Sequence, residues 1–180
     1  MTSEDIFSQL ISHMIKGLMV HTQLAEYFAF LGFNGFQYEQ EHHYIEESKS
    51  YRKIFNYYIN QFNKLINENK VDNPKLIPAN WYNVNRFDVD AVTKRKGVKN
   101  GFEEWKKWEI ETKQTYEIYY KEILEIDDIS SRLIIEKLIE DVSEEIRTIN
   151  KRILELEDIE YDLIYINEIQ KDLEHRYKDI

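Results

Sequence analysis

"HTQLAEYFAFLGFNGF", residues 21–36, holds the end of one apolar stripe and the turn that follows it. The stripe starts upstream and repeats at alternating spacings of four and three residues, which is typical of the buried face of a bundled helix. The two glycines of "GFNGF" (32–36) then interrupt the pattern. We therefore predict a helix at about 4–31, with inward positions Leu10, Met14, Gly17, His21, Leu24, Phe28 and Leu31.

The next stretch, "HHYIEESKSYRKI" (42–54), lies in a second helix that we expect at about 37–67. Its phase is less clear because polar and apolar residues mix along it. Taking Ser48, Phe55 and Phe62 as inward, at about 100° per residue, turns His42 and His43 outward. On this phase the inward positions are Glu41, Tyr44, Ile45, Ser48, Tyr51, Phe55, Ile59, Phe62, Leu65 and Ile66.

An irregular region separates the first two predicted helices from the rest of the chain. Residues 68–101 contain both prolines and the breaker residues Gly97, Asn100 and Gly101. Further helices are expected at about 102–126, 131–157 and 161–177, with "DDISS" (127–131) as the turn between the first two of these.

The predicted elements form two helical hairpins joined by one long connection. An extended chain covers about 3.3 Å per residue, so a connection of this length can run back along a whole helix. We therefore expect an all-α fold, an up-down-down-up four-helix bundle with a long crossover and an extra C-terminal helix. We expect residues 1–180 to form one domain.

Composition and charge exclude several classes of function. There are no cysteines, so disulfides and thiolate metal sites are excluded. No apolar run approaches the length of a membrane span, and the acidic N-terminus is unlike a signal peptide, so we expect a cytoplasmic protein without a membrane partner. Residues 101–180 hold 12 basic against 23 acidic side chains, which argues against nucleic acid as a partner.

In architecture the chain resembles the ferritin-like superfamily, including the mini-ferritins, over about residues 6–156. The resemblance is carried by "HTQLAEYFAFLGFNGF", by "HHYIEESKSYRKI", by the long crossover and by "SSRLIIEKLIEDVSEEI" (130–146). The chain also resembles small phage-type helical proteins. The superfamily resemblance implies two metal ions, each hairpin supplying a Glu from one helix and Glu-x-x-His from the other. Glu39 and His42 have that spacing, but the chosen phase turns His42 outward.

Polar residues at inward positions, or at their border in the case of Glu47 and Glu145, define a candidate metal site at mid-bundle. Counting turns from the two hairpin ends places His21 level with Glu47, and Glu109 within about one turn of Glu145. One imidazole and three carboxylates suit Fe, Mn or Zn. The alternative metal residues are Glu41, which is inward, and an outward His43 that resembles half of the intersubunit site of mini-ferritins. A third interpretation needs no metal, because a core histidine can hydrogen-bond to a neighbouring Tyr or Glu.

For function, we expect a bundle that acts through self-assembly or partner binding, without redox catalysis. The absence of inward Glu-x-x-His pairs, the uneven charge and the amphipathic last helix support this expectation. On this view the protein is not an enzyme, and it is a homo-oligomer or binds another protein. The alternative is a metal-binding ferritin-like protein, with Fe, Mn or Zn as cofactor and an iron-handling or oxidase activity.

Overall fold

The computed structural model describes residues 1–66 and 71–178. Within these ranges the chain has no strand. Two short 3-10 turns, Ala79–Trp81 (η2) and Arg86–Asp88 (η3), lie in the connection between the second and third helices. The α-helices are α1 (Ser3–Leu31), α2 (Asn34–Phe62), α3 (Ala91–Ile126), α4 (Ile129–Asp158) and α5 (Leu163–Tyr177).

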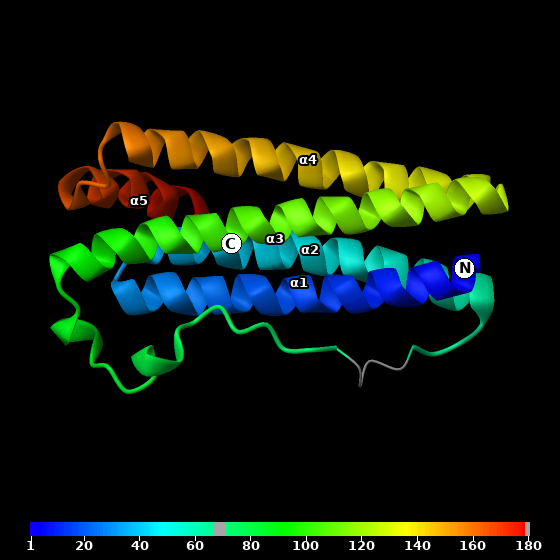
Figure 1. Cartoon of the computed structure of the whole chain (residues 1–180), viewed down its shortest axis with the longest axis horizontal. Coiled ribbons are helices and arrows are strands. Elements are labelled where there is room, and N and C mark those ends of the chain that lie inside the picture. The colour runs from blue at the N-terminus through cyan, green and yellow to red at the C-terminus, as the bar shows by residue number, and fades with distance from the viewer. Residues whose placement is uncertain (67–70, 179–180) are drawn as a thin grey trace.

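The helices form two antiparallel hairpins, α1 with α2 and α3 with α4 (Figure 1). The connection from α2 returns along the outside of α1 before α3 begins, so α2 and α3 point the same way. Helix α1 packs on α3, and α5 folds back against α2. The predicted all-α, up-down-down-up bundle with a long crossover and an extra C-terminal helix is confirmed. No helix among the described residues is both long and apolar enough to span a bilayer.

Capping residues fix where α1, α3 and α4 begin. The Thr2 hydroxyl accepts from the Asp5 backbone N–H and the Asp5 carboxylate accepts from the Thr2 N–H, which is a capping box at α1. Asp90 accepts from the Thr93 N–H at the start of α3, and Asp128 accepts from the Ser131 N–H at the start of α4. Gly32 ends α1 with φ 87°, a conformation that glycine adopts without strain.

The prediction that the third helix begins at residue 102 is wrong, because α3 begins eleven residues earlier, at Ala91. Gly97 and Gly101 lie inside the helix and let it approach α1 closely. A Cβ at Gly97 would lie 2.7 Å from Leu31 Cδ1, and one at Gly101 would lie 2.7 Å from Phe28 Cζ. The glycines that look like helix breakers are contact residues.

The predicted end of the second helix is also corrected, since α2 ends at Phe62 with Asn63 in a left-handed conformation. The crossover therefore comprises residues 63–90 and is shorter than the predicted 68–101. Residue 67, where we expected the helix to end, and the predicted crossover positions 68–70 lie outside the described residues.

Part of the crossover is fixed to α1 by specific contacts. The Gln23 side chain donates to Asn73 Oδ1 and to the Pro74 carbonyl, and it accepts from the Leu76 N–H at 3.0 Å. The Trp81 ring stacks on Tyr27 at 5.2 Å with 4° between the planes. The crossover thus covers the outer side of α1.

The bundle interior consists of two apolar clusters with polar side chains between them. One cluster surrounds the α1–α2 turn and includes Phe28, Phe36, Phe102 and the inner face of α5. The other lies toward the α3–α4 turn and includes Phe7 and Ile123. Along each of the four long helices, the residues between these clusters supply the polar groups that form the candidate site.

Candidate metal centre

Three side chains from three helices meet at mid-bundle. His21 on α1 lies with its Nε2 atom 3.5 Å from Glu47 Oε1 on α2 and 3.5 Å from Glu109 Oε1 on α3. His21 is fully buried and Glu109 is 1% exposed, whereas the Glu47 side chain is 23% exposed. One ligand atom from each of the three lies within 4.8 Å of the other two. We call this group the triad.

The local sequence explains how the triad is placed. His21 continues the α1 stripe, and Glu109 follows Trp105 and Trp108 on the buried face of α3. Glu47 reaches the interior because α1 carries Gly17 opposite it. A Cβ at Gly17 would lie 2.7 Å from Glu47 Oε2, so a larger residue would push the carboxylate away. The glycine therefore makes room for a charged group.

Each residue of the triad has one buried polar atom without a hydrogen-bond partner. These atoms are His21 Nε2, Glu47 Oε2 and Glu109 Oε1, and the other oxygen of Glu47 lies 3.5 Å from His21 Nε2. A buried polar group without a partner costs about 1–3 kcal/mol, more if it is charged. Three such atoms at one point indicate a site organised around something that all three can bind.

Burial and neighbouring charges perturb the protonation of the triad. Burial, together with the nearby Glu145 carboxylate, raises the pKa of Glu109 to about 8. Burial alone would lower the pKa of His21, but the Glu47 and Glu109 carboxylates raise it well above its ordinary value. Without a metal, the interior therefore keeps protons where negative charge would accumulate.

The other nitrogen of His21 does have a partner. Its Nδ1 atom lies 2.9 Å from Oε1 of Gln40, which is fully buried on α2. The sequence analysis did not find Gln40, although Phe36, Gln40, His43 and Glu47 follow each other at spacings of four, three and four residues. That spacing is the same bundle signal that revealed α1, carried here mostly by polar residues.

A second histidine–carboxylate pair adjoins the triad. His43 Nδ1 lies 2.9 Å from Glu145 Oε1 on α4, and Trp105 Nε1 donates to the same oxygen at 3.3 Å. The His43 and His21 rings stack at 5.6 Å. Burial is the largest influence and raises the pKa of Glu145, but the hydrogen bonds from His43 and Trp105 and the charges of His43 and His21 together outweigh it, so the net shift is downward. Glu145 is therefore a paired carboxylate, unlike Glu109.

The expected phase of α2 is corrected by this arrangement. His43, expected outward, lies inside against Trp105 and Glu145, with its side chain 20% exposed. Glu41, expected inward, is exposed and accepts a hydrogen bond from Gln37 at 2.8 Å. Tyr44 is 40% exposed. The predicted inward face of α2 was set by apolar residues in its C-terminal half, and it is off by about one residue from the observed face.

A buried ion pair, also missed from the sequence, lies near the second pair. Glu39 on α2 is 4% exposed, and its Oε1 is 3.7 Å from Arg152 Nη2 on α4. Burial raises the pKa of Glu39 although Arg152 opposes the shift. Its i+3 neighbour His42 stacks on Tyr177 of α5. The Glu39–His42 spacing thus places the two groups against α4 and α5, outside the triad.

The donor atoms of the triad suit a divalent transition metal. One imidazole nitrogen and two carboxylate oxygens are ligands of Fe, Mn and Zn. Two ligand atoms each about 2.1 Å from a tetrahedral ion are about 3.4 Å apart, close to the observed 3.5 Å contacts. The residues present therefore fit such an ion. Of the candidate ligands predicted from the sequence, the structure brings together His21, Glu47 and Glu109, and it places Glu145 with His43.

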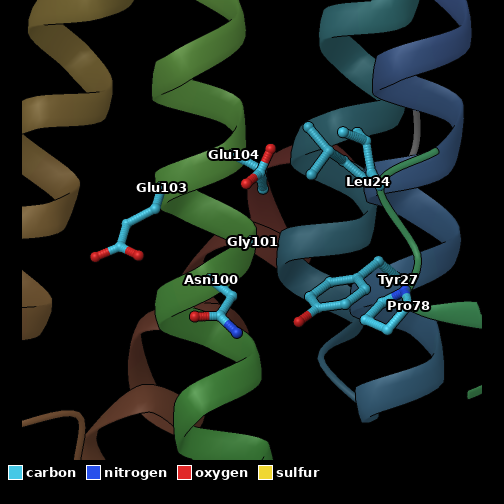
Figure 2. A pocket seen from close by; sticks show the side chains of 8 residues that line it. Leu24, Tyr27, Pro78, Asn100, Gly101, Glu103 and Glu104 are labelled. Carbon is cyan, nitrogen blue, oxygen red and sulfur yellow. The ribbon is translucent and has the colours of Figure 1, made fainter. Parts of the chain in front are cut away.

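A separate pocket of about 320 Å³ lies between α1, α3 and the crossover (Figure 2). It is lined partly by Tyr27, Asn100, Glu103 and Glu104, and by none of the candidate ligands. Glu103 points away from Tyr27 in the view of Figure 2. Glu103 and Glu104 pair at 3.8 Å with Lys99 and Lys107 respectively, so these acids are already neutralised on their own helix.

Comparisons with known proteins bear on the fold of this chain. No protein-family model matches the chain, and no curated protein does either. Among solved structures, an open-pore ferritin from Archaeoglobus fulgidus is similar with a TM-score of 0.76 and 15% identity, over 95% of this chain and 94% of that one.

Two further structures support the same fold. An iron-soaked variant of the ferritin PmFTN is similar with a TM-score of 0.74 and 11% identity, over 93% of this chain and 96% of that one. Rhodobacter capsulatus bacterioferritin, described with a metal-free dinuclear site and haem iron, has a TM-score of 0.67 and 15% identity, over 87% and 86%. The fold of this chain is the ferritin-like helical bundle.

Proposed function

We propose that this protein binds one divalent first-row metal ion per chain, through His21, Glu47 and Glu109. The observation that carries the proposal is the convergence of three residues, each of which has a buried polar atom without a hydrogen-bond partner. A neighbour that is described as soaked in iron favours Fe²⁺, while Mn²⁺ and Zn²⁺ suit the same donors. Bound metal would supply the positive charge that the buried carboxylates lack, and the protein would keep it out of bulk water.

The second pair supports one ion rather than two. His43 and Glu145 already bond to each other at 2.9 Å, and Trp105 donates to the same carboxylate. A second ion would have to break both contacts, whereas the triad atoms have none to lose. We therefore expect mononuclear binding without the chemistry that needs two adjacent ions, which matches the function expected from the sequence, a bundle without redox catalysis.

Metal content is the direct test of this function. Protein purified without a chelator should contain close to one equivalent of Fe, Mn or Zn by elemental analysis, and adding the metal to stripped protein should raise its melting temperature. Glu47→Gln should lose both effects. Glu41→Gln, a matched control on the exposed side of the same helix, should lose neither. A stripped wild-type protein that neither binds nor gains stability would refute the proposal.

A second role, self-assembly, is supported by an apolar patch around the α3–α4 turn. The patch consists of Leu124, Ile126, Ile129 and Leu133, which are 40–58% exposed. Large exposed apolar clusters are typical of interfaces. We expect a homo-oligomer in light scattering that Leu133→Asp disrupts. The control Leu154→Asp changes a side chain of similar exposure at the opposite end of α4. If both substitutions disrupt the oligomer equally, the apolar patch is not its specific interface.

A further inference from the structure

The buried amide of Gln40 contacts Nδ1 of His21, the ring nitrogen that does not face the triad carboxylates. Gln40 and His21 are both fully buried, and Oε1 of the amide lies 2.9 Å from Nδ1 of the ring. A carboxamide oxygen has no hydrogen to give, so the hydrogen of this bond belongs to His21 Nδ1. When the ring is neutral, as metal binding requires, its lone pair is therefore on Nε2, the nitrogen that lies beside Glu47 and Glu109.

We propose that Gln40 is a positioning residue of the metal centre, which fixes the tautomer and the rotation of the His21 ring so that Nε2 is the ligand atom. The inference rests on the metal-binding function proposed above. Hydrogen bonds to the far nitrogen of a ligand histidine generally set its orientation and its metal affinity. Here the partner is a neutral side chain of the neighbouring helix.

The aromatic contacts of the His21 ring do not fix its rotation completely, so this hydrogen bond contributes to it. The His21 ring stacks on His43 with 19° between the planes and meets the edge of Trp105 at 86°. These aromatic contacts define the plane of the ring but do not distinguish its two faces. A half-turn about the Cβ–Cγ bond would replace Nε2 with a carbon atom. The bond to Gln40, at 2.9 Å, is the shortest polar contact that opposes that half-turn, and the two carboxylates that lie 3.5 Å from Nε2 act in the same direction.

A neutral amide also suits the charge of this layer. Glu47, Glu109 and Glu145 all lie near His21, and burial already raises the pKa of Glu109. An amide orients the ring without adding another negative charge. Its own Nε2 atom is buried without a partner, so the observed rotamer leaves one donor unpaired in order to keep the oxygen on His21. The opposite rotamer would donate to Nδ1, put the ring hydrogen on Nε2 and block the ligand atom.

The test compares three substitutions at Gln40 in the full chain, with Zn²⁺ as the probe. Gln40→Met keeps the length and removes the acceptor, Gln40→Glu keeps the acceptor, and Gln40→Asn withdraws it by one methylene. Gln37→Met, one turn earlier on the same helix, is the control. We expect Gln40→Met and Gln40→Asn to weaken Zn²⁺ binding about 10–100-fold, and Gln40→Glu and the control to stay near the wild-type affinity. Gln40→Asn decides the question if Gln40→Met does not fold.

A spectroscopic readout separates positioning from mere loss of structure. In ¹⁵N spectra of histidine-labelled, Zn²⁺-loaded protein, His21 should carry a directly bonded, exchange-protected hydrogen on Nδ1 and metal on Nε2. The protection should disappear in Gln40→Met and return in Gln40→Glu. Unchanged affinity in Gln40→Met, or metal on Nδ1, would overturn the inference while leaving metal binding intact.

Failure of metal binding itself has a different signature. If wild-type protein binds no Zn²⁺, Fe²⁺ or Mn²⁺, the proposed function is lost, but the metal-free spectrum still decides the role of Gln40. A protected Nδ1 hydrogen in wild type that Gln40→Met removes would support the fixed tautomer. A hydrogen on Nε2 alone would refute it.

Discussion

His13 and His21 lie on the same helix, but their surroundings shift their pKa values in opposite directions. His13 Nε2 lies 2.9 Å from the Thr112 hydroxyl, and its ring stacks on Trp108 at 4.7 Å. Burial and the nearby Lys16 lower the pKa of His13 to about 4. His21 lies between two carboxylates that raise its pKa well above the ordinary value.

The difference shows how a structural histidine can be told from a candidate ligand. The ring of His13 is neutral, hydrogen-bonded to an uncharged group and held by an aromatic face, so it behaves as a core residue. His21 instead has an unpartnered nitrogen that faces unpartnered carboxylate oxygens. The partners decide between the two roles, since both histidines lie on the inner side of α1.

The largest expected contrast between the two histidines is in metal affinity. Binding of a structural zinc is worth about 10–16 kcal/mol, so losing one of three ligands costs on the order of 4 kcal/mol, about 1,000-fold in Kd. His21→Ala should show that loss in a Zn²⁺ competition titration, and His13→Ala should bind as wild type does. Equal losses in both variants would mean that the effect comes from folding and would erase the distinction.

Alkaline pH should destabilise the metal-free protein through the triad. The pKa of Glu109 is about 8 in the folded chain against an ordinary 4.5, so its contribution to stability is complete below about pH 4.5 and is lost as the pH rises through 8. The raised pKa of His21 acts in the same direction. Urea unfolding with a chelator should give a loss on the order of 3 kcal/mol between pH 5 and 9.

Glu109→Gln identifies the source of that loss, because the amide cannot titrate. The variant should flatten the pH dependence between pH 5 and 9. A wild-type free energy of unfolding that rises over this range would contradict the assignment.

Acid pH should act through His13 instead. Its folded pKa of about 4 lies below the ordinary 6.5, so the unfolded chain takes up a proton first. Stability is therefore complete above about pH 6.5 and falls by roughly 2–3 kcal/mol as the pH drops to 4. His13→Phe keeps the stack on Trp108 and removes the proton site, so the acid slope in urea unfolding should shrink. If the acid slope of the free energy of unfolding is unchanged in His13→Phe, groups other than His13 cause it.

The smallest expected effect concerns Lys16, whose ammonium lies 5.4 Å from the centre of the Trp108 ring. Lys16→Met should cost about 0.5–1 kcal/mol through the lost cation–π contact. It should also raise the pKa of His13 toward its ordinary value, because a neighbouring positive charge is removed. NMR titration of both histidines would measure this. A change in the pKa of His21 instead of His13 would show that the surroundings of the two histidines are coupled.

Sequence reasoning found the fold because α1 carries an unbroken apolar stripe and both hairpin turns have clear signals. It missed the start of α3, since Gly97 and Gly101 look like breakers until a facing helix is present. It misjudged the phase of α2 because the inward positions there include Glu39, Gln40, His43 and Glu47, which reduce the apolar contrast on which phasing depends.

The candidate site was therefore predicted only in part. His21, Glu47 and Glu109 were named because each lies at mid-height of its helix, and the structure brings them together. The pairing of Glu145 with His43, and the contact of Gln40 with His21, depend on side-chain directions that are set by packing between helices. A single sequence does not contain that information once the phase is off by one residue.

The division of the triad between the hairpins has a mechanical consequence. His21 and Glu47 belong to the α1–α2 hairpin, and Glu109 belongs to α3 in the other one. A bound ion would crosslink the two hairpins. Its binding energy would therefore resist sliding and separation of the hairpins rather than strengthen any single helix.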